Sequence, residues 1–434
     1  MKLKFSNIGK ISSAEIDITS ISLIAGINNS GKSTAGKLLF GLAQSLNLLN
    51  DSNLLLHKIT SISDSIRGIR RFTKKQEYLN EIRNISRYKN LLDSDNTDDL
   101  DFLVVEEKFC EAVKSLLSKI EADEDGLNDN NQGKINVTIE KIQERLDLPF
   151  DSESIKYSQI NGVLLNEFSN SLISKYKGVQ EATIELFEDN EDYLRLFFEN
   201  EKLIYDKSTI EVSRDYSSAI YIDDPFILDE EDFLWPRLGN YHRNSLIKSL
   251  MNFQNNPNYF EINYQQKAIN EIFSNVLDGI VVKNDQSFTY KNDMLSEEID
   301  IGNLSAGMKS FLLIKLLIES GQMDDAEYLI LDEPEVHLHP KWQLEYAKLV
   351  VLISLNFPIR ILITSHSPYF IEALDIYSKQ YKNKGIKYYK SVPDQNNSMR
   401  ITLQEVTESL DEIFEDMYQP LNLLSELRDE IEYE

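Results

Sequence analysis

Two short stretches of the chain contain residue types that handle phosphate groups. In LIAGINNSGKST, residues 23–34, the spacing G-x-x-x-x-G-K-[ST] is matched by Gly26, Gly31, Lys32 and Ser33. Such glycines let backbone N–H groups turn toward a phosphate, the lysine reaches the β and γ phosphates, and the serine hydroxyl is a ligand for Mg²⁺. A glycine-rich turn with an accidental lysine is the plainer alternative, but apolar segments precede and follow the loop. The spacing therefore predicts a nucleotide loop.

The second stretch, EYLILDEPE at residues 327–335, places carboxylates at the end of an apolar run. Such a run predicts a buried strand, and ligands bind at the carboxyl ends of the strands in a parallel sheet. Asp332 is the predicted residue on the Mg²⁺ side, and Glu333 is the predicted general base that takes a proton from water. The motif is weak alone, but together with the loop around Lys32 it predicts nucleotide chemistry.

A third candidate is the helix start in IGNLSAGMKS, residues 301–310. Ser305 predicts a helix cap and Gly307 predicts a close backbone approach. Exposed N–H groups at a helix start favour an anion. Because the chain already has one phosphate loop, we expect this segment to complete the nucleotide pocket of a second copy.

Three of the five histidines lie near these motifs, at positions 337, 339 and 366. His337 and His339 are candidates for zinc ligands, but two histidines at i and i+2 without a nearby cysteine lack the usual ligand spacing. His366, in ITSHS, has the alternative role of capping the next helix.

Alternating and apolar segments surround the motifs. The predicted strands occupy residues 2–8, 13–18, 20–25, 201–206, 208–213 and 218–224, and a predicted hairpin occupies 279–291. A mostly helical pattern continues from about residue 32 to 200, with helices too broken for a long coiled coil. Beyond residue 297, strand and helix patterns alternate, which is typical of βαβ units on a parallel sheet. The predicted fold class is α/β.

The order of the motifs resembles that of ABC-type ATPases. A Walker A loop is followed by LSAGMK, similar to the LSGGQ signature, and then by the Walker B strand and ITSHS. DEPEVHLHP looks like the Walker B and D-loop of the branch that includes SMC-type, RecF-type and overcoming-lysogenization-defect (OLD) ATPases. The resemblance implies an ABC-type P-loop NTPase core, a mixed sheet with flanking helices, that carries a large and mainly helical insertion.

The same resemblance implies four segments of the chain. They are 1–50, the core part with Walker A; 51–296, the insertion with some strands; 297–380, the core part with signature, Walker B, D-loop and switch histidine; and 381–434, strands and an acidic helix.

The resemblance also implies roles for individual residues. Lys32, Glu333 and His366 would be catalytic, with His366 contacting the γ-phosphate, while Ser33 and Asp332 would hold Mg²⁺. His337 and His339 fall in the D-loop, which in that family runs along the dimer seam. The implied ATP-binding residues are Gly26, Asn28, Asn29, Ser30, Gly31, Lys32, Ser33, Thr34, Ser305, Ala306, Gly307 and His339.

The chain departs from the family pattern in two places. The glutamine that senses Mg²⁺ at the lid boundary has no evident counterpart, although SAIYIDDPF offers Asp223 or Asp224 as a substitute. OLD enzymes add a Toprim nuclease, but the chain after His366 is too short for one and has no recognisable acidic triad. The design therefore resembles the stand-alone ATPase subunits of bacterial anti-phage systems such as Septu, which work with a separate nuclease or toxin.

Composition limits the expected partners. A net charge of −27 argues against non-specific electrostatic binding to nucleic acid or anionic lipid. One basic stripe, formed by Arg67, Arg70, Arg71 and Lys74 if the segment is helical, is a candidate site for nucleic acid or an acidic partner. The alternative is a solvated face that pairs with the chain's own carboxylates.

Composition also indicates a compartment. A single cysteine, no signal-peptide pattern and no apolar run near about 20 residues predict a cytoplasmic protein without a membrane span.

The sequence thus predicts a slow ATPase, with ATP and Mg²⁺ as cofactors, that switches a separate effector in anti-phage defence. We expect a homodimer, or a higher even oligomer, with shared ATP sites. A RecF- or SMC-like DNA-repair ATPase and an ATP-locked scaffold with little turnover are the alternatives. The intact Glu333 favours hydrolysis over the scaffold.

Overall fold

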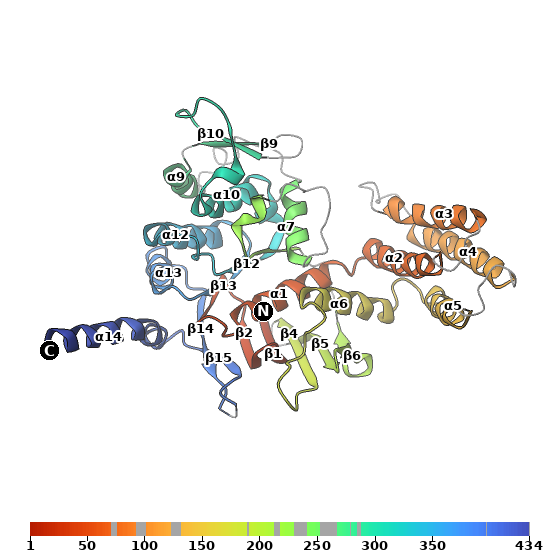
Figure 1. The fold of residues 1–434 in the computed structure, drawn as a ribbon, viewed down its shortest axis with the longest axis horizontal. Helices are drawn as coiled ribbons and strands as arrows, with labels where there is room; N and C mark the ends of the chain where they lie inside the picture. The colour runs from red at the N-terminus through yellow and green to blue at the C-terminus, as the bar shows by residue number, and fades with distance from the viewer. Residues whose placement is uncertain are drawn as a thin grey trace. The chain divides into compact units, whose positions relative to one another are not determined.

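Figure 1 shows the fold of the chain as a computed structural model. The structure describes all residues except 71–75, 93–100, 123–131, 189–190, 212–217, 230–240, 252–266, 278, 284–287, 396 and 434. The chain forms two compact units. One consists of Met1–Gln44 with Val163–Glu434, and the other of Ser45–Gly162.

The first unit is built on a mixed sheet. Twelve strands of the described chain belong to it, in the order β6-β5-β4-β1-β2-β15-β14-β3-β13-β12-β8, with β7 paired to β5. Their bounds are β1 Lys2–Ile8, β2 Ile11–Asp17, β3 Ile21–Ala25, β4 Glu181–Glu188, β5 Glu191–Glu199, β6 Lys202–Leu203, β7 Thr209–Ile210, β8 Ser218–Ile222, β12 Ala326–Asp332, β13 Arg360–Ser365, β14 Ile386–Pro393 and β15 Ile401–Glu405. Strands β14, β3, β13, β12 and β8 run parallel, so their carboxyl ends meet at one edge of the sheet.

Helices and a small sheet complete this unit. The helices are α1 Lys32–Asn47, which begins in it, α6 Glu153–Glu167, which ends in it, α7 Tyr241–Met251, α9 Lys267–Val276, α10 Ala306–Glu319, α11 Gln322–Asp325, α12 Pro340–Asn356, α13 Pro368–Gln380 and α14 Asp411–Tyr433. Short 3₁₀ helices are η2 Tyr205–Lys207, η3 Pro225–Asp229 and η5 Ile301–Asn303, and the small sheet pairs β9 Ile280–Lys283, β10 Phe288–Lys291 and β11 Ile299–Asp300. Within the described chain, no helix is both long and apolar enough to cross a membrane.

The parallel strands are apolar because helices cover both of their faces. Leu329 and Leu331 of β12 belong to a core shared with α10, α12 and α13, which Figure 1 shows stacked on one side of β12 and β13. On the opposite face, a Cβ atom at Gly36 of α1 would lie 3.0 Å from side chains of Ile330 and Tyr221. Glycine at this position lets α1 pack closely on the sheet, which fixes the helix that follows the nucleotide loop.

The second unit is a helical lobe with its own core. It contains α2 Asp51–Arg70, α3 Gln76–Leu92, α4 Phe102–Glu121, α5 Gln132–Leu146 and most of α6. Along α4 the buried side chains recur about every four residues, as at Val105, Phe109 and Val113, which is the period of an amphipathic helix. These residues pack with apolar side chains of α2, α3 and α5. The expected compact lobe, in place of a coiled-coil arm, is confirmed.

The predicted α/β class, with a mixed sheet, flanking helices and a helical insertion, is confirmed. The helical pattern expected up to residue 200 was wrong over residues 181–199, where β4 and β5 form a hairpin on the sheet. Glu, Leu and Arg are good helix formers, but pairing of β4 with β1 overrides that local preference. The division at residues 50, 296 and 380 stays a prediction, and the compact units have other boundaries.

The core of the helical lobe can be tested at Phe109, which is fully buried and packs its ring edge-on against Tyr88. Phe109→Ala leaves a cavity, and we expect it to lower the free energy of unfolding by about 3–5 kcal/mol in urea denaturation. The matched control is Leu103→Ala on the same helix, because Leu103 is 69% exposed. Its effect should stay within about 0.5 kcal/mol. Equal effects of the two variants would contradict the packing described.

Candidate active site

The loop from Gly26 to Gly31 joins the carboxyl end of β3 to α1. Asn29 and Gly31 have left-handed φ angles of 62° and 79°, which curve the backbone into a concave turn. Gly26 donates its N–H to the carbonyl of Ser365 at 3.3 Å, which ties the loop to the end of β13. Because α1 begins at Lys32, the positive end of its dipole lies at this turn. The loop thus has the shape and the polarity of a phosphate site.

Lys32 links this loop to the strand β12. Its ammonium group donates to the carbonyls of Gly26 and Ile27, both at 2.9 Å, and lies 3.1 Å from Glu333 Oε1. The side chain is only 3% exposed, so its charge needs partners inside the protein. Three acceptors match the three N–H donors of a lysine. A phosphate that binds Lys32 must therefore take the place of at least one of them.

Two neighbouring strands fix the orientation of Asp332. From β8, the hydroxyl of Tyr221 donates to Asp332 Oδ2 at 2.9 Å, and from β13 the hydroxyl of Thr364 donates to Oδ1. Burial raises the pKa of Tyr221 well above its ordinary value, so this hydroxyl keeps its proton. Glu333 then turns away from the strand with a left-handed φ of 51°, and its N–H donates to the Thr364 carbonyl at 3.0 Å. The turn directs the Glu333 carboxylate toward Lys32.

His366 stands at the end of β13 between two carboxylates. Its Nδ1 lies 3.5 Å from Glu333 Oε2 and 3.4 Å from Glu335 Oε1. Glu335 is buried and accepts hydrogen bonds from the His366 N–H at 2.9 Å and the Ser365 hydroxyl at 2.7 Å. Burial raises the pKa of Glu335, although those hydrogen bonds oppose the shift. The structure therefore brings Lys32, Glu333 and His366 together, and adds Glu335 as the residue that holds the histidine loop.

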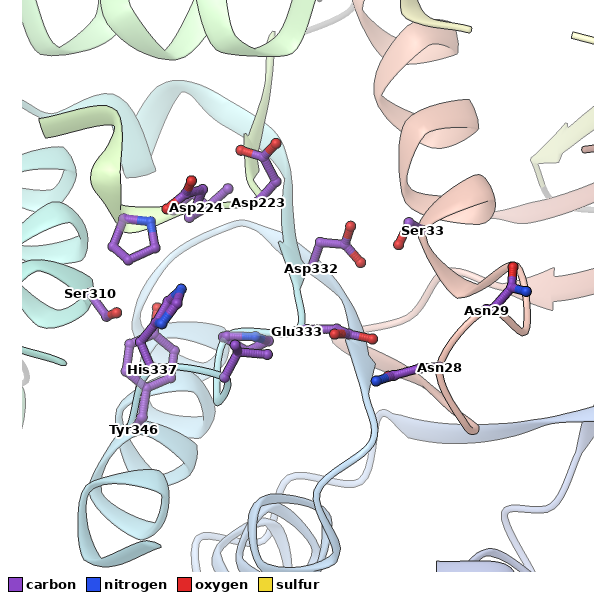
Figure 2. A pocket seen from close by; sticks show the side chains of 14 residues that line it. Asn28, Asn29, Ser33, Asp223, Asp224, Ser310, Asp332, Glu333, His337 and Tyr346 are labelled. Carbon is purple, nitrogen blue, oxygen red and sulfur yellow. The ribbon is translucent and has the colours of Figure 1, made fainter. Parts of the chain in front are cut away.

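Of these residues, Glu333 lines a cavity of about 340 Å³. Figure 2 shows Asp332 directed toward Ser33 across it, with Glu333 and Asn28 facing each other below. The residues that line the cavity are Asn28, Asn29, Ser33, Ile222, Asp223, Asp224, Pro225, Ser310, Asp332, Glu333, Pro334, Val336, His337 and Tyr346. A hydroxyl and carboxylates are the oxygen ligands that Mg²⁺ prefers. Ser33 and Asp332 therefore fit the predicted metal role, and Asp223 and Asp224 line the same cavity.

The signature segment lies at a different hollow. Ser305 caps α10 by accepting the N–H of Met308 at 3.3 Å, and a Cβ at Gly307 would lie 2.7 Å from the Trp342 ring. A second cavity of about 390 Å³ is lined by Ser305, Ala306, Gly307, His337, His339, Lys341 and Trp342. Within one chain the signature residues therefore line a separate cavity from the one that contains Ser33 and Asp332.

The two D-loop histidines have structural contacts of their own. His339 caps α12, since its Nδ1 accepts the Lys341 N–H at 3.3 Å. The ring of His337 packs edge-on against Phe226, with centroids 5.1 Å apart. These contacts account for both side chains without a zinc ion.

Part of the basic stripe lies outside the described residues. Arg71 and Lys74 are not described, and neither is the side chain of Arg70. Arg67, on α2, pairs with Asp64 at 3.2 Å. This pairing is what the solvated-face alternative expects at that position, and the nucleic-acid interpretation stays a prediction.

Sequence reasoning did not find the residues that support the predicted site. Tyr221, Thr364 and Glu335 act by hydrogen bonds across strands or turns. Their only local signal is adjacency to motif residues, in SAIYIDD, ITSHS and DEPE.

A buried histidine was also missed. His242 lies between Glu167, at 2.5 Å, and Asp223, at 3.1 Å. Burial lowers the pKa of His242, but the hydrogen bonds and charges of the two carboxylates outweigh burial and raise it overall.

The parallel sheet edge, the loop before α1 and the paired carboxylates define a P-loop nucleotide-binding protein. The chain belongs to the family described as "AAA domain, putative AbiEii toxin, Type IV TA system", whose family model matches residues 21–372.

One curated relative and two solved structures show further similarity. The Retron Vc95 probable ATPase of Vibrio cholerae serotype O1 biovar El Tor is 27% identical over 165 residues, which are 34% of this chain and 32% of the relative. The chain thus spans about a third of the length of that relative. A crystal structure of the SmcHead bound to the C-winged helix domain of ScpA has 10% identity and a TM-score of 0.41, covering 95% of this chain and 98% of that chain. The SMC head domain from Thermotoga maritima has 10% identity and a TM-score of 0.36, covering 93% and 98%.

The close approach at Gly26 gives a direct test of the loop. A Cβ at this position would lie 1.8 Å from Ser391 Oγ and 2.9 Å from Ser30 Oγ. Gly26→Ala therefore forces the loop to move, and overpacking of about 1–3 kcal/mol should weaken ATP binding about 5- to 150-fold in calorimetry.

The control for this variant is Gly162→Ala, since a Cβ at Gly162 meets nothing within 4 Å. We expect it to leave ATP affinity unchanged. Adding Ser391→Ala to Gly26→Ala removes the closest atom and should restore part of the affinity. Undiminished ATP binding by Gly26→Ala would exclude the loop as the nucleotide site.

Proposed function

We propose that the chain binds and hydrolyses ATP, and that two copies close on shared nucleotides to act as a switch. The observation that carries the proposal is the contact of Lys32 with Glu333, which lines the same cavity as Ser33 and Asp332. It joins the phosphate-binding lysine and the candidate base in one site. Hydrolysis needs both groups within reach of the same phosphate.

Each residue of the site has a separate task in this proposal. Lys32 leaves its loop carbonyls and Glu333 to bind the β and γ phosphates. Glu333, released from that pairing, orients the attacking water and accepts its proton, and His366 lies next to Glu333 to contact the γ-phosphate. Ser33 and Asp332 would hold Mg²⁺, which supplies neutralisation of phosphate charge.

The cavity at the signature helix supports a shared site. Ser305 and Gly307 lie at the N-terminal end of α10, where backbone N–H groups and the helix dipole favour an anion. Within one chain they line a different cavity from Ser33 and Asp332. A second copy that presents its α10 end to the first cavity would complete each nucleotide site, and two-fold symmetry would form both sites at once.

We further propose that the closed dimer signals to a separate effector, such as a nuclease or toxin, in the cytoplasm during anti-phage defence. The name of the relative, a probable ATPase of a retron, and the toxin–antitoxin description of the family support a chain that works as one component of a larger system. A Septu-like arrangement is one form that such a system would take.

A mixing experiment tests the shared site. Lys32→Ala removes the phosphate-binding lysine, and Ser305→Glu places a negative charge at the α10 end, so neither variant alone should hydrolyse ATP. In a mixed dimer one site combines the intact loop of one copy with the intact signature end of the other. We therefore expect an equal mixture to recover a substantial part of the wild-type hydrolysis rate.

The matched control mixes Lys32→Ala with Glu333→Gln. Both changes lie on the same side of a site, so every site of a mixed dimer keeps a defect and no activity should return. Recovery in the control but not in the test mixture, or recovery in neither, would contradict the shared site. Wild-type protein that hydrolyses no ATP would contradict the proposed function itself.

A further inference from the structure

We propose that His242 is a positioning residue for the metal-binding side of the nucleotide site, because it holds Asp223 in place beside Asp332. The proposal rests on the proposed function, since it concerns how that same site binds Mg²⁺ with ATP. His242 does not line the cavity, and it would act through Asp223 and Tyr221.

The first support is a buried chain of three side chains. His242 Nδ1 lies 2.5 Å from Glu167 Oε1, and His242 Nε2 lies 3.1 Å from Asp223 Oδ2. The side chains of Glu167 and His242 are both fully buried, whereas that of Asp223 is 28% exposed. Glu167 ends α6, His242 lies in the first turn of α7, and Asp223 follows β8. The chain of contacts therefore runs from the core to the wall of the cavity.

The second support is the set of aromatic contacts around His242. Its ring lies against the Tyr221 ring, with centroids 4.6 Å apart, and edge-on to Phe40 at 6.0 Å. Tyr221 is the residue that donates its hydroxyl to Asp332. The His242 imidazole thus hydrogen-bonds directly to Asp223. It also packs against Tyr221, which in turn hydrogen-bonds to Asp332.

The third support is the remaining oxygen of Asp223. Oδ1 is buried and has no hydrogen-bond partner among the described residues, and Arg243 Nη1 lies 3.6 Å away. Asp223 lines the same cavity as Ser33 and Asp332, and Figure 2 shows it beside Asp332. A carboxylate with one oxygen fixed by histidine and the other without a hydrogen bond is suited to hold a metal ion or its water shell.

Stability alone gives a weaker account of this arrangement. A buried histidine between two carboxylates loses much hydration energy, and apolar residues of similar volume often stabilise a core as well. A functional role explains the network better, because the hydrogen bond from His242 would keep the Asp223 carboxylate ionised and in a fixed orientation. If the network only stabilises the fold, changing it should leave the effect of Mg²⁺ on ATP binding intact. If it positions Asp223, changing it should reduce that effect.

The test compares the affinity of a non-hydrolysable ATP analogue with and without Mg²⁺, measured by calorimetry on the full chain. In His242→Gln we expect the gain in affinity that Mg²⁺ confers to fall about 10- to 100-fold, as is typical when a residue supporting a metal ligand is changed. Affinity in EDTA should stay within about 2-fold of wild type, because Lys32 and the loop are intact. Asp223→Asn should give the same pattern. The double variant should lose little more than either single change, because both act through one contact.

The matched control is His57→Gln in the helical lobe, where His57 hydrogen-bonds to Ser158 at 3.2 Å. It should leave the Mg²⁺ gain unchanged. If His242→Gln does not fold, the test uses Asp223→Asn and Glu167→Gln, which keep the shape of each side chain. The quantity compared is again the ratio of the affinity with Mg²⁺ to the affinity in EDTA. A full Mg²⁺ gain in the folded variants, or additive losses in the double variant, would overturn the inference. A wild-type protein without any Mg²⁺ gain would instead overturn the proposed function.

Discussion

The contact between Lys32 and Glu333 is the interaction on which the site depends. A lysine that is only 3% exposed is stable as a cation only when acceptors surround it, and Glu333 supplies a full negative charge in contact with it. The two residues come from distant parts of the chain. They meet because β13 lies between β3 and β12, with all three parallel and their carboxyl ends at one edge. The sheet order is thus a condition for the chemistry.

The same contact suggests how the site would respond to nucleotide. Phosphates would compete for the donors of Lys32, which bonds with the loop carbonyls and Glu333. If Lys32 turns to phosphate, Glu333 would lose this counter-ion, while His366 lies 3.5 Å from it. The positive φ of Glu333 and the hydrogen bonds from Ser365 and His366 to the buried Glu335 would keep Glu333 and His366 in place through this change. The proposed switch therefore needs movement of charged side chains and little movement of the sheet.

Local patterns predicted the parts of the site that a short segment can encode. The loop before α1, the acidic end of β12 and the helix cap at Ser305 each depend on neighbours in sequence, and all three are present. The partners of Asp332 depend on strand order, because Tyr221 and Thr364 reach it from β8 and β13. No spacing in the sequence contains that order. The hairpin of β4 and β5 was missed for a related reason, since its pairing with β1 outweighs its helix-forming composition.

The most direct measurement is the ATP hydrolysis rate of Glu333→Gln, taken together with its ATP affinity. The substitution keeps the shape of the side chain, removes the base and frees Lys32 from its ionic partner. The account predicts that hydrolysis falls about 10²- to 10⁴-fold while ATP binds as tightly as in wild type or more tightly. A variant that hydrolyses ATP at the wild-type rate would contradict the account.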